Sequence, residues 1–273
     1  MADPGAAPAA TGAVPRRTPV SGCVITFQEA DRIAACVQSL AFCDEVVVVD
    51  SGSTDGTCAI AAGLGARVVH NAPFPGFAAQ RQFAVEQCRN DFVLCLDADE
   101  RVTPELAAEI GALAAAAALE GGYELPRHNR YLGRRMRFGL FAPDRKLRLF
   151  DRRLGCVVST RQPHDHVQLQ PGTPVRVLRG GLDHLNYRDL RSHLRTIDSY
   201  ARQFAQHEAA RGVRVPLLAV PARALAVLGK SLVLKLGFLD GWRGVFCACL
   251  AAYSTWLKYF RAWRAVRRRA EAA

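Results

Sequence analysis

The sequence lacks the signatures of several protein classes. Its nine cysteines are odd in number and contain no CxxC pair. Most of them lie inside apolar runs, as Cys23, Cys36, Cys58 and Cys95 do, where a cysteine behaves as a small buried hydrophobe. This pattern excludes a disulfide-stapled secreted domain and favours a reducing compartment.

Long apolar runs are also missing. The longest uncharged apolar stretch extends only from Gly244 to Leu257, whereas a membrane-spanning helix needs about 20 residues. Residues 1–19 are rich in Ala, Pro, Gly and Thr and contain no apolar core typical of a signal peptide. We therefore expect a disordered leader over residues 1–19, no transmembrane helix, and a cytoplasmic protein that is peripherally associated with the inner membrane.

Several nucleotide and nucleophile motifs are absent as well. The chain has no GxGxxG, no GxxxxGK[ST] and no GxSxG, which argues against a dinucleotide site, a P-loop and a hydrolase elbow. It also has no RNP, KH or helix-turn-helix pattern. A nucleic-acid-binding protein, which the basic composition would otherwise suggest, is therefore the weaker interpretation, and we expect no nucleic-acid partner.

What the chain does have is apolar content and an uneven charge. Half of its residues are hydrophobic and 22% are charged, so it can bury a sizeable core. Lys+Arg balance Asp+Glu over residues 1–187, and the whole net charge of +11 lies in residues 188–273. This division predicts a neutral catalytic or binding domain followed by a segment that meets an anionic partner.

Hydrophobic periodicity predicts an α/β domain over residues 20–186. Short β-branched or apolar runs alternate with helical patterns, which is typical of a mostly parallel central sheet. Thr103 and Pro104 begin an alanine-rich helix that Gly121-Gly122 is expected to end. From residue 187 to residue 273 the pattern is helical. The four strands expected are Val20–Thr26, Glu45–Asp50, Arg67–His70 and Phe92–Leu96.

Polar side chains follow three of these strands, where ligands bind in open α/β sheets. Asp97-Ala98-Asp99 is the sharpest pattern, since residues i and i+2 at an extended strand end face the same way. Two carboxylates in that position suit Mg²⁺ or Mn²⁺ bound jointly with substrate phosphates. For any single acid after a strand, capping a helix or filling a turn is the more ordinary explanation, but three polar strand ends at one edge of a sheet are harder to explain in that way.

These motifs together resemble a known family. In order they are Thr26-x-Gln28-Glu29, VVVVDSGSTDGT ending at Thr57, Gly76-x-x-x-Gln80-Arg81 and LDADE from Leu96 to Glu100. The chain is similar to inverting family 2 glycosyltransferases of GT-A (Rossmann-like) fold. Pro143-Asp144-Arg145, His164-Asp165 and His184 narrow the similarity to bacterial lipopolysaccharide inner-core β-1,4-glucosyltransferases.

The resemblance implies a UDP-sugar donor, a Mg²⁺ or Mn²⁺ cofactor and a lipid-linked saccharide acceptor. Asp99 would be the main metal ligand, with His184 completing the metal site. Asp165 would be the base that deprotonates the acceptor hydroxyl, with Asp144 as the alternative. Acceptor or phosphate contacts would come from Arg145, Arg148 and His164, although a solvated strand face explains the two arginines as well. Donor-binding residues would be Thr26, Gln28, Glu29, Asp50, Ser51, Gly52, Gln80, Arg81, Asp97 and Ala98.

The chain departs from the family pattern in three places. Gln28 and Gln82 stand where the family usually has Asn, and Asp165 stands where it usually has Glu. Each change alters side-chain length by a methylene, so the donor pocket and the reach of the base are both affected. The donated sugar, the acceptor and the choice of base stay open, as does an acceptor that is a polyprenyl phosphate.

The basic segment 187–273 predicts a membrane-associating helical extension. Tyr253, Leu257, Phe260 and Trp263 recur at helical spacing with cations around them, as in helices that lie in a bilayer interface. Residues 223–239 repeat the theme with Lys230 and Lys235. Packing of this helix against the enzyme core is the competing explanation. We expect the extension to meet an anionic membrane surface.

Overall fold

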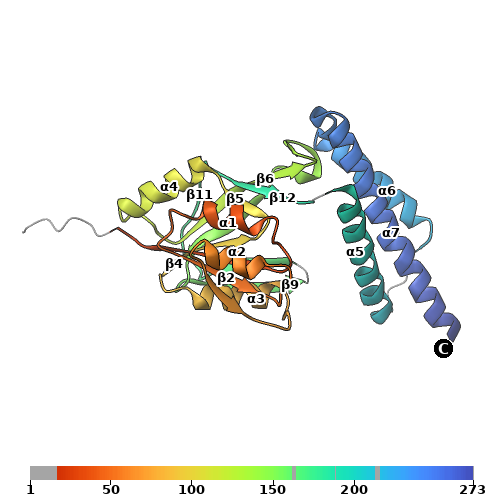
Figure 1. Ribbon diagram of the computed structural model, residues 1–273. Coiled ribbons are helices and arrows are strands. Elements are labelled where there is room, and N and C mark those ends of the chain that lie inside the picture. The colour runs from red at the N-terminus through yellow and green to blue at the C-terminus, as the bar shows by residue number, and fades with distance from the viewer. Residues whose placement is uncertain (1–16, 162–163, 188, 213–215, 273) are drawn as a thin grey trace, which may run out of the picture.

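The structure is a computed structural model that describes residues 17–161, 164–187, 189–212 and 216–272. Residues 1–16, most of the expected leader, lie outside the described residues. Figure 1 shows an α/β domain beside a set of long helices, and the chain passes from one to the other between β12 (Leu182–Leu185) and α5 (Leu190–Ala210).

The α/β domain is built on one large mixed sheet. The order of its main strands is β3-β2-β1-β4-β8-β6-β12-β5, and β7 and β11 also pair with β6. Their bounds are β1 Val20–Thr26, β2 Glu45–Asp50, β3 Arg67–His70, β4 Phe92–Asp97, β5 Glu100–Val102, β6 Gly122–Tyr131, β7 Arg134–Arg135, β8 Arg145–Asp151 and β11 Val175–Val177.

The expectation of a mostly parallel sheet is right for the first four strands, whereas the second half is mixed: β11 and β12 pair with β6 in parallel, and the other pairs there are antiparallel. β3, β2, β1 and β4 are all parallel, but β8 is antiparallel to both β4 and β6, and β12 is antiparallel to β5. β8 reaches β4, and β12 reaches β5, from distant parts of the chain, so local sequence does not specify the direction of these pairs.

The two faces of the sheet carry separate cores. The side chains of β2 alternate, so Val48 packs with α1 (Ile33–Ser39) and α2 (Thr57–Gly63), whereas Val47 and Val49 pack toward α3 (Phe77–Gln87). This double burial explains why the strand is a continuous run of valines. A hairpin of β9 (Gly155–Arg161) and β10 (His164–Leu169) packs against α3.

The alanine-rich helix α4 (Pro104–Ala115) begins as expected and ends early. Thr103 caps it by accepting the N–H of Leu106 at 3.3 Å. It stops at Ala115 instead of Gly121-Gly122. Gly121, at φ +65°, lies just before β6, and its position leaves no room for a Cβ against Pro174.

The extension consists of α5, α6 (Ala219–Gly229), a π-helical turn η2 (Lys230–Leu234), a 3₁₀ turn η3 (Gly237–Asp240) and α7 (Trp242–Ala272). α5, α6 and α7 lie side by side. α5 meets the α/β domain near η1 (Gly139–Phe141), where Tyr131 and Met136 share an apolar cluster with Ile197 and Cys247. Within the described residues, none of the helices combines the length and the apolar character needed to cross a bilayer.

Candidate active site

Three parallel strands end together at one edge of the sheet. Thr26 at the end of β1 is paired with Asp50 at the end of β2, and Ile25 is paired with Asp97 at the end of β4. The expected convergence of polar strand ends is therefore present. Thr26 is buried, and its Oγ1 has no hydrogen-bond partner among the described residues. A buried hydroxyl without a partner is costly, which is the signature of a place that a polar ligand completes.

Asp50 organises the loop that follows β2. Its fully buried carboxylate accepts the backbone N–H groups of Gly52 and Ser53, each at 2.8 Å, and the Ser53 hydroxyl at 2.5 Å. Burial opposes ionisation, but these hydrogen bonds outweigh it and lower the pKa of Asp50. The structure thus holds Asp50 as an anion that shapes the loop from within.

The β1 loop and the β2 loop are tied to each other. The Gln28 N–H donates to Ser53 Oγ at 2.8 Å, and the Gln28 amide donates to Thr54 Oγ1 at 2.9 Å. The Glu29 N–H donates to Thr57 Oγ1 at 2.9 Å. Gln28 has φ +55°, a strained value for a residue with a side chain. The side chain of Gln28 therefore links the two loops.

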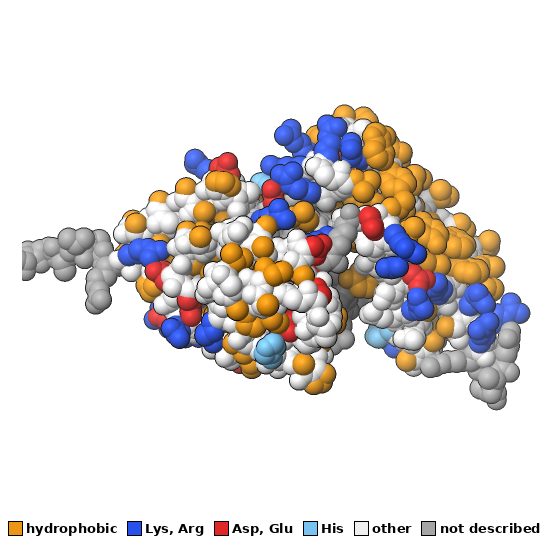
Figure 2. All heavy atoms as spheres, viewed as in Figure 1, with side chains coloured by type: hydrophobic (Ala, Val, Ile, Leu, Met, Phe, Trp, Pro, Cys, Tyr) orange, Lys and Arg blue, Asp and Glu red, His pale blue; other side chains and the backbone are white. Residues whose placement is uncertain are grey.

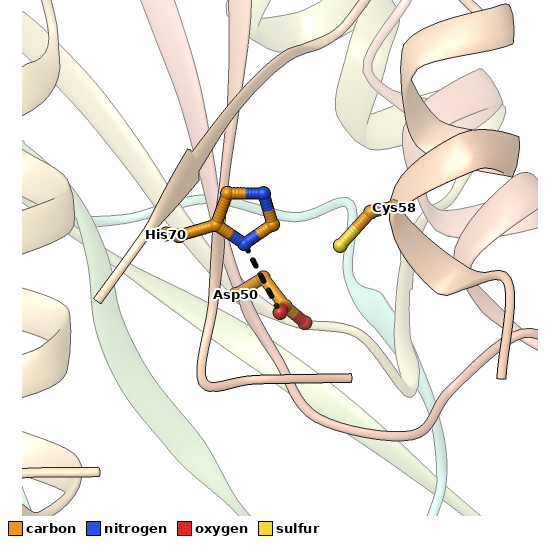
Figure 3. Close-up of side chains that lie close together, drawn as sticks. All are labelled: Asp50, Cys58 and His70. Atoms are coloured by element: carbon orange, nitrogen blue, oxygen red, sulfur yellow. Dashed lines mark ion pairs between the residues drawn. The ribbon is translucent and has the colours of Figure 1, made fainter. Parts of the chain in front are cut away.

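Asp50 also lies in a small cluster that sequence reasoning missed. Ligand atoms of Asp50, Cys58 and His70 all lie within 4.8 Å of one another, and His70 Nδ1 is 3.5 Å from Asp50 Oδ2 (Figure 3). Burial and the neighbouring Asp50 raise the pKa of Cys58 to about 11. Ligation of a metal by Cys58 would therefore have to displace the proton of its thiol. His70 ends β3, so its place at a strand end was the available signal.

Gln80 and Gln82 of α3 form hydrogen bonds to two different neighbouring segments. The Gln80 amide donates to Ser51 Oγ at 3.0 Å and its carbonyl oxygen accepts from the Asn71 amide at 2.8 Å. Gln82 Oε1 accepts the N–H of Val157 in β9 at 2.8 Å. The second Asn-to-Gln departure therefore lies at a contact between α3 and the β9–β10 hairpin.

Asp97 is held between two arginines. Arg81 donates to Asp97 Oδ1 and Arg148 to Asp97 Oδ2, each at 2.8 Å, and both arginines are buried. Burial of the carboxyl opposes ionisation, but the two guanidinium groups dominate and hold the pKa of Asp97 far below its usual range. Because Arg148 is buried in this clamp, its alternative as part of a solvated strand face is wrong.

Glu100 extends the clamp and was not singled out by the sequence. This fully buried carboxylate accepts from Arg148 at 3.1 Å and from Arg127 at 3.3 Å, and it also accepts the Asp97 N–H at 3.0 Å. A buried acid needs such partners. Its place directly after Asp97-Ala98-Asp99 was the only sequence signal. The burial of Glu100 beside the two arginines depends on the tertiary structure.

Asp99 lies in different surroundings from Asp97. Asp99 Oδ2 lies 3.5 Å from His184 Nε2 and 3.7 Å from the guanidinium of Arg32. β12 brings His184 here by pairing with Glu100 of β5 on one side and with Asn129 of β6 on the other. The two residues expected to share a metal are therefore adjacent, although 85 positions of sequence separate them.

The amide of Asn129 sets which nitrogen of His184 faces Asp99. Asn129 is buried, and its Nδ2 donates to the Phe141 carbonyl at 2.7 Å and to Asp144 Oδ2 at 3.2 Å. Its Oδ1 must then accept from His184 Nδ1, 2.7 Å away. His184 consequently donates through Nδ1, and its Nε2 is the nitrogen that faces Asp99. A carboxylate oxygen beside an oriented imidazole nitrogen fits a divalent cation.

Asp144 is engaged by positive and polar groups. Arg127 donates to Asp144 Oδ2 at 2.7 Å, and Lys146 lies 3.6 Å from Oδ1. Burial opposes ionisation, but Arg127, Asn129 and Lys146 together lower the pKa of Asp144. A lowered pKa weakens a general base. These contacts favour a positioning role for Asp144 over the alternative role as base.

The remaining expected residues lie at the margins of the described structure. Arg145 is exposed at the start of β8. The backbones of His164 and Asp165 begin β10, with an irregular register between them, but their side chains lie outside the described residues. Ala98 is buried between the two acids.

Comparison with known proteins relates this chain to glycosyltransferases. Residues 21–143 match the model of the family described as Glycosyl transferase family 2. The lipopolysaccharide core biosynthesis glycosyltransferase LpsC of Rhizobium meliloti is 34% identical over 161 residues, which are 55% of this chain and 57% of that protein. An uncharacterized glycosyltransferase, RP128 of Rickettsia prowazekii, is 27% identical over 88% of this chain and 85% of its own. These findings make the chain similar to family 2 glycosyltransferases.

The similarity is uneven along the chain. A glycosyltransferase of Rickettsia felis is 48% identical over 92 residues, a third of either chain, so the matches to it and to LpsC span less than two thirds of those relatives. Among solved structures, glucosyl-3-phosphoglycerate synthase of Mycobacterium tuberculosis shares 26% identity over 42% of this chain and 44% of its own, with a TM-score of 0.34. S. aureus TarS 1–349 shares 15% identity over 94% and 92%, with a TM-score of 0.46.

Proposed function

We propose that this protein is a metal-dependent, inverting hexosyltransferase that moves glucose from UDP-glucose to a lipid-linked saccharide, such as the inner core of lipopolysaccharide. The observation that carries the proposal is the pair of Asp99 and His184, oriented by Asn129 beside the arginine-held Asp97. The name of the Rhizobium meliloti relative supports the acceptor class. A polyprenyl phosphate is the second acceptor, and no contact described above favours it.

A Mg²⁺ or Mn²⁺ ion would be held by Asp99 and by Nε2 of His184. When bound, such an ion stabilises the negative charge that gathers on a departing nucleoside diphosphate. Donor recognition falls to the loop that Asp50 anchors, with the Thr26 hydroxyl available as a hydrogen-bond donor in the floor of the site.

The protein's own residues supply the rest of the reaction. Arg81 and Arg148 keep Asp97 ionised and fix the strand end from which Asp99 projects. Removal of the acceptor proton would fall to Asp165; the contacts of Asp144 with Arg127 and Lys146 make Asp144 the weaker alternative base. A positioned general base contributes typically about 10²–10⁴-fold in rate.

The test measures transfer of radiolabel from UDP-glucose to membranes that carry truncated lipopolysaccharide, with Mn²⁺ or EDTA present. We expect metal-dependent transfer by the wild type and a loss of about 10³-fold or more in Asp99→Asn, because a neutral amide is a poor ligand for a hard cation. Equal activity of Asp99→Asn and the wild type would contradict the metal role.

Asn129→Ala separates orientation of the metal ligand from ligation itself. We expect its Mn²⁺ affinity, measured by isothermal titration, to fall about 10–100-fold, as for other partners that orient a ligating histidine. Gln82→Ala is the control, since Gln82 contacts Val157 and not His184. Unchanged Mn²⁺ affinity in Asn129→Ala would remove the orienting role.

A further inference from the structure

One side of the extension exposes an unusual amount of apolar surface. Leu218 is 86% exposed and Leu234 is 78% exposed, values that a folded soluble domain rarely gives to leucine. Figure 2 shows hydrophobic side chains gathered continuously along the outer edge of the helices. We name this the apolar face, formed by Leu218, Leu225, Val233, Leu234, Phe238, Leu239 and Trp242.

The packing of α6, η2 and α7 explains why this apolar surface is exposed. Val220 of α6, Ser231 of η2 and Cys247 of α7 are buried against the rest of the protein, so the opposite sides of these elements are already used for packing. Gly237 brings η3 against the backbone of η2, where its Cβ position would lie 2.7 Å from the Ser231 carbonyl oxygen. The two turns therefore form a fixed tip that points its large side chains outward.

Cations border the apolar face. A cavity of about 340 Å³ lies at its edge, lined by Arg134, Arg135, Arg137, Phe138, Leu239 and Asp240. Leu239 belongs to both the cavity and the apolar face. The acid that lines the cavity, Asp240, is already hydrogen-bonded within the protein. Its carboxylate accepts the N–H groups of Arg137 and Phe138, each at 2.9 Å. Arg223, Lys230, Lys235 and Arg243 add further charge along α6, η2 and the start of α7.

The aromatic stripe expected from the sequence is divided by the structure. Leu257 is buried in the cluster that joins the extension to the α/β domain, and Phe260 and Trp263 pack against Ala205 and Val220. Tyr253 alone of the four is largely exposed. The packing explanation therefore holds for most of this stripe, and the surface available to a partner lies around the tip of η2 and η3 instead.

We propose that the apolar face is a docking surface for an anionic bilayer, and that the arginine-lined cavity at its edge receives a phospholipid headgroup. A bilayer fits because it offers apolar depth and negative charge together, the combination that interfacial segments and basic pockets recognise. The inference deepens the proposed function, on which it rests for a lipid-linked acceptor.

The test is sedimentation of the full chain with vesicles of phosphatidylcholine alone or with 30% phosphatidylglycerol. We expect the double variant Leu218→Gln, Leu234→Gln to bind anionic vesicles at least tenfold more weakly than the wild type, since two large side chains no longer leave water. Leu64→Gln is the matched control, a part-exposed leucine that follows α2 in the α/β domain, and it should bind as the wild type does.

The headgroup cavity is tested by Arg134→Ala, Arg135→Ala. At about fivefold per cation, we expect about 25-fold weaker binding to anionic vesicles and little change with neutral ones. The control double variant Arg89→Ala, Arg202→Ala removes the same charge from exposed positions. Arg89 lies in the loop before β4, and Arg202 lies on α5. We expect this control to weaken binding to anionic vesicles less. Equal losses of vesicle binding in the two double variants would show that the cavity contributes only general electrostatic attraction, which would overturn its headgroup role.

Two results would overturn docking to a bilayer. One is vesicle binding by Leu218→Gln, Leu234→Gln equal to that of the wild type. The other is a dimer of the wild type in sedimentation velocity that the same variant converts to a monomer, which would assign the apolar face to a second copy of this chain. Asp99→Asn should bind vesicles normally, so failure of the catalytic proposal and failure of docking are separate outcomes.

Discussion

Asp97 and Asp99 are identical side chains two positions apart, yet their surroundings give them different tasks. Both oxygens of Asp97 accept from buried arginines, whereas Asp99 faces an imidazole nitrogen. The spacing alone predicts that both carboxylates face one ligand. The division of labour depends on Arg81 and Arg148, which arrive from α3 and β8, and so could not be predicted from the local pattern.

This difference predicts opposite effects of the two Asp-to-Asn substitutions. Asp97→Asn removes the carboxylate that the buried guanidinium groups of Arg81 and Arg148 share, so we expect the free energy of unfolding to fall by about 3 kcal/mol. Asp99→Asn should change it by less than about 1 kcal/mol while abolishing metal-dependent transfer. Urea denaturation of both variants makes the comparison, and similar losses of stability would contradict the clamp.

At the scale of elements, strand positions were predicted best. β1, β2 and β3 have the bounds that the sequence indicated, because strands buried on both faces require unbroken apolar runs. The end of α4 was predicted poorly, because Gly122 begins β6 and Gly121 packs against Pro174 just before it, so neither residue ends the helix. Of the antiparallel strands in the second half, β8 was indicated by the alternation of basic and apolar residues over Lys146–Phe150, but its antiparallel pairing with β4 and β6 was not, because these partners are distant in the sequence.

The junction between α5 and the α/β domain carries a buried histidine. His193 stacks on Tyr187 with ring centroids 3.8 Å apart, and its Nδ1 lies 3.1 Å from the Tyr131 hydroxyl. Burial lowers the pKa of His193 to about 4, against about 6.5 for an unfolded chain. The folded state therefore keeps this imidazole neutral.

We expect this histidine to make stability depend on pH between about 6.5 and 4. Over that range the unfolded chain binds a proton that the folded protein does not, so stability is full above pH 6.5 and falls by about 2–3 kcal/mol toward pH 4. The difference in urea stability between the wild type and His193→Gln at each pH isolates this contribution from that of the carboxyl groups. A difference that does not vary with pH would contradict it.

At the scale of the whole molecule, the extension is part of the folded unit. Tyr131 and Met136 of the α/β domain are buried together with Ile197 of α5 and Cys247 of α7. The sequence division near residue 187 therefore marks a change of secondary structure and charge, while the apolar core continues across it.

This continuity predicts the result of removing the last helices. A chain that ends at Gly212 loses α6 and α7 and exposes Met136 and the inner side of α5, so we expect aggregation or a melting temperature lower by about 10 °C or more. Differential scanning fluorimetry and size exclusion measure both. A monomer that melts at the wild-type temperature would show that the α/β domain is independent.

The sequence by itself determined the parallel half of the sheet, the acids at its edge and the basic character of the extension. Each of these is written in a contiguous run of residues, because buried strands, strand-end acids and local charge are properties of neighbouring positions. Only the tertiary structure decided that His184 and Asn129 join Asp99, that two arginines hold Asp97, and that Leu257 packs inward while Leu234 faces solvent. These pairings depend on strand register and helix packing between distant segments, which no local pattern specifies.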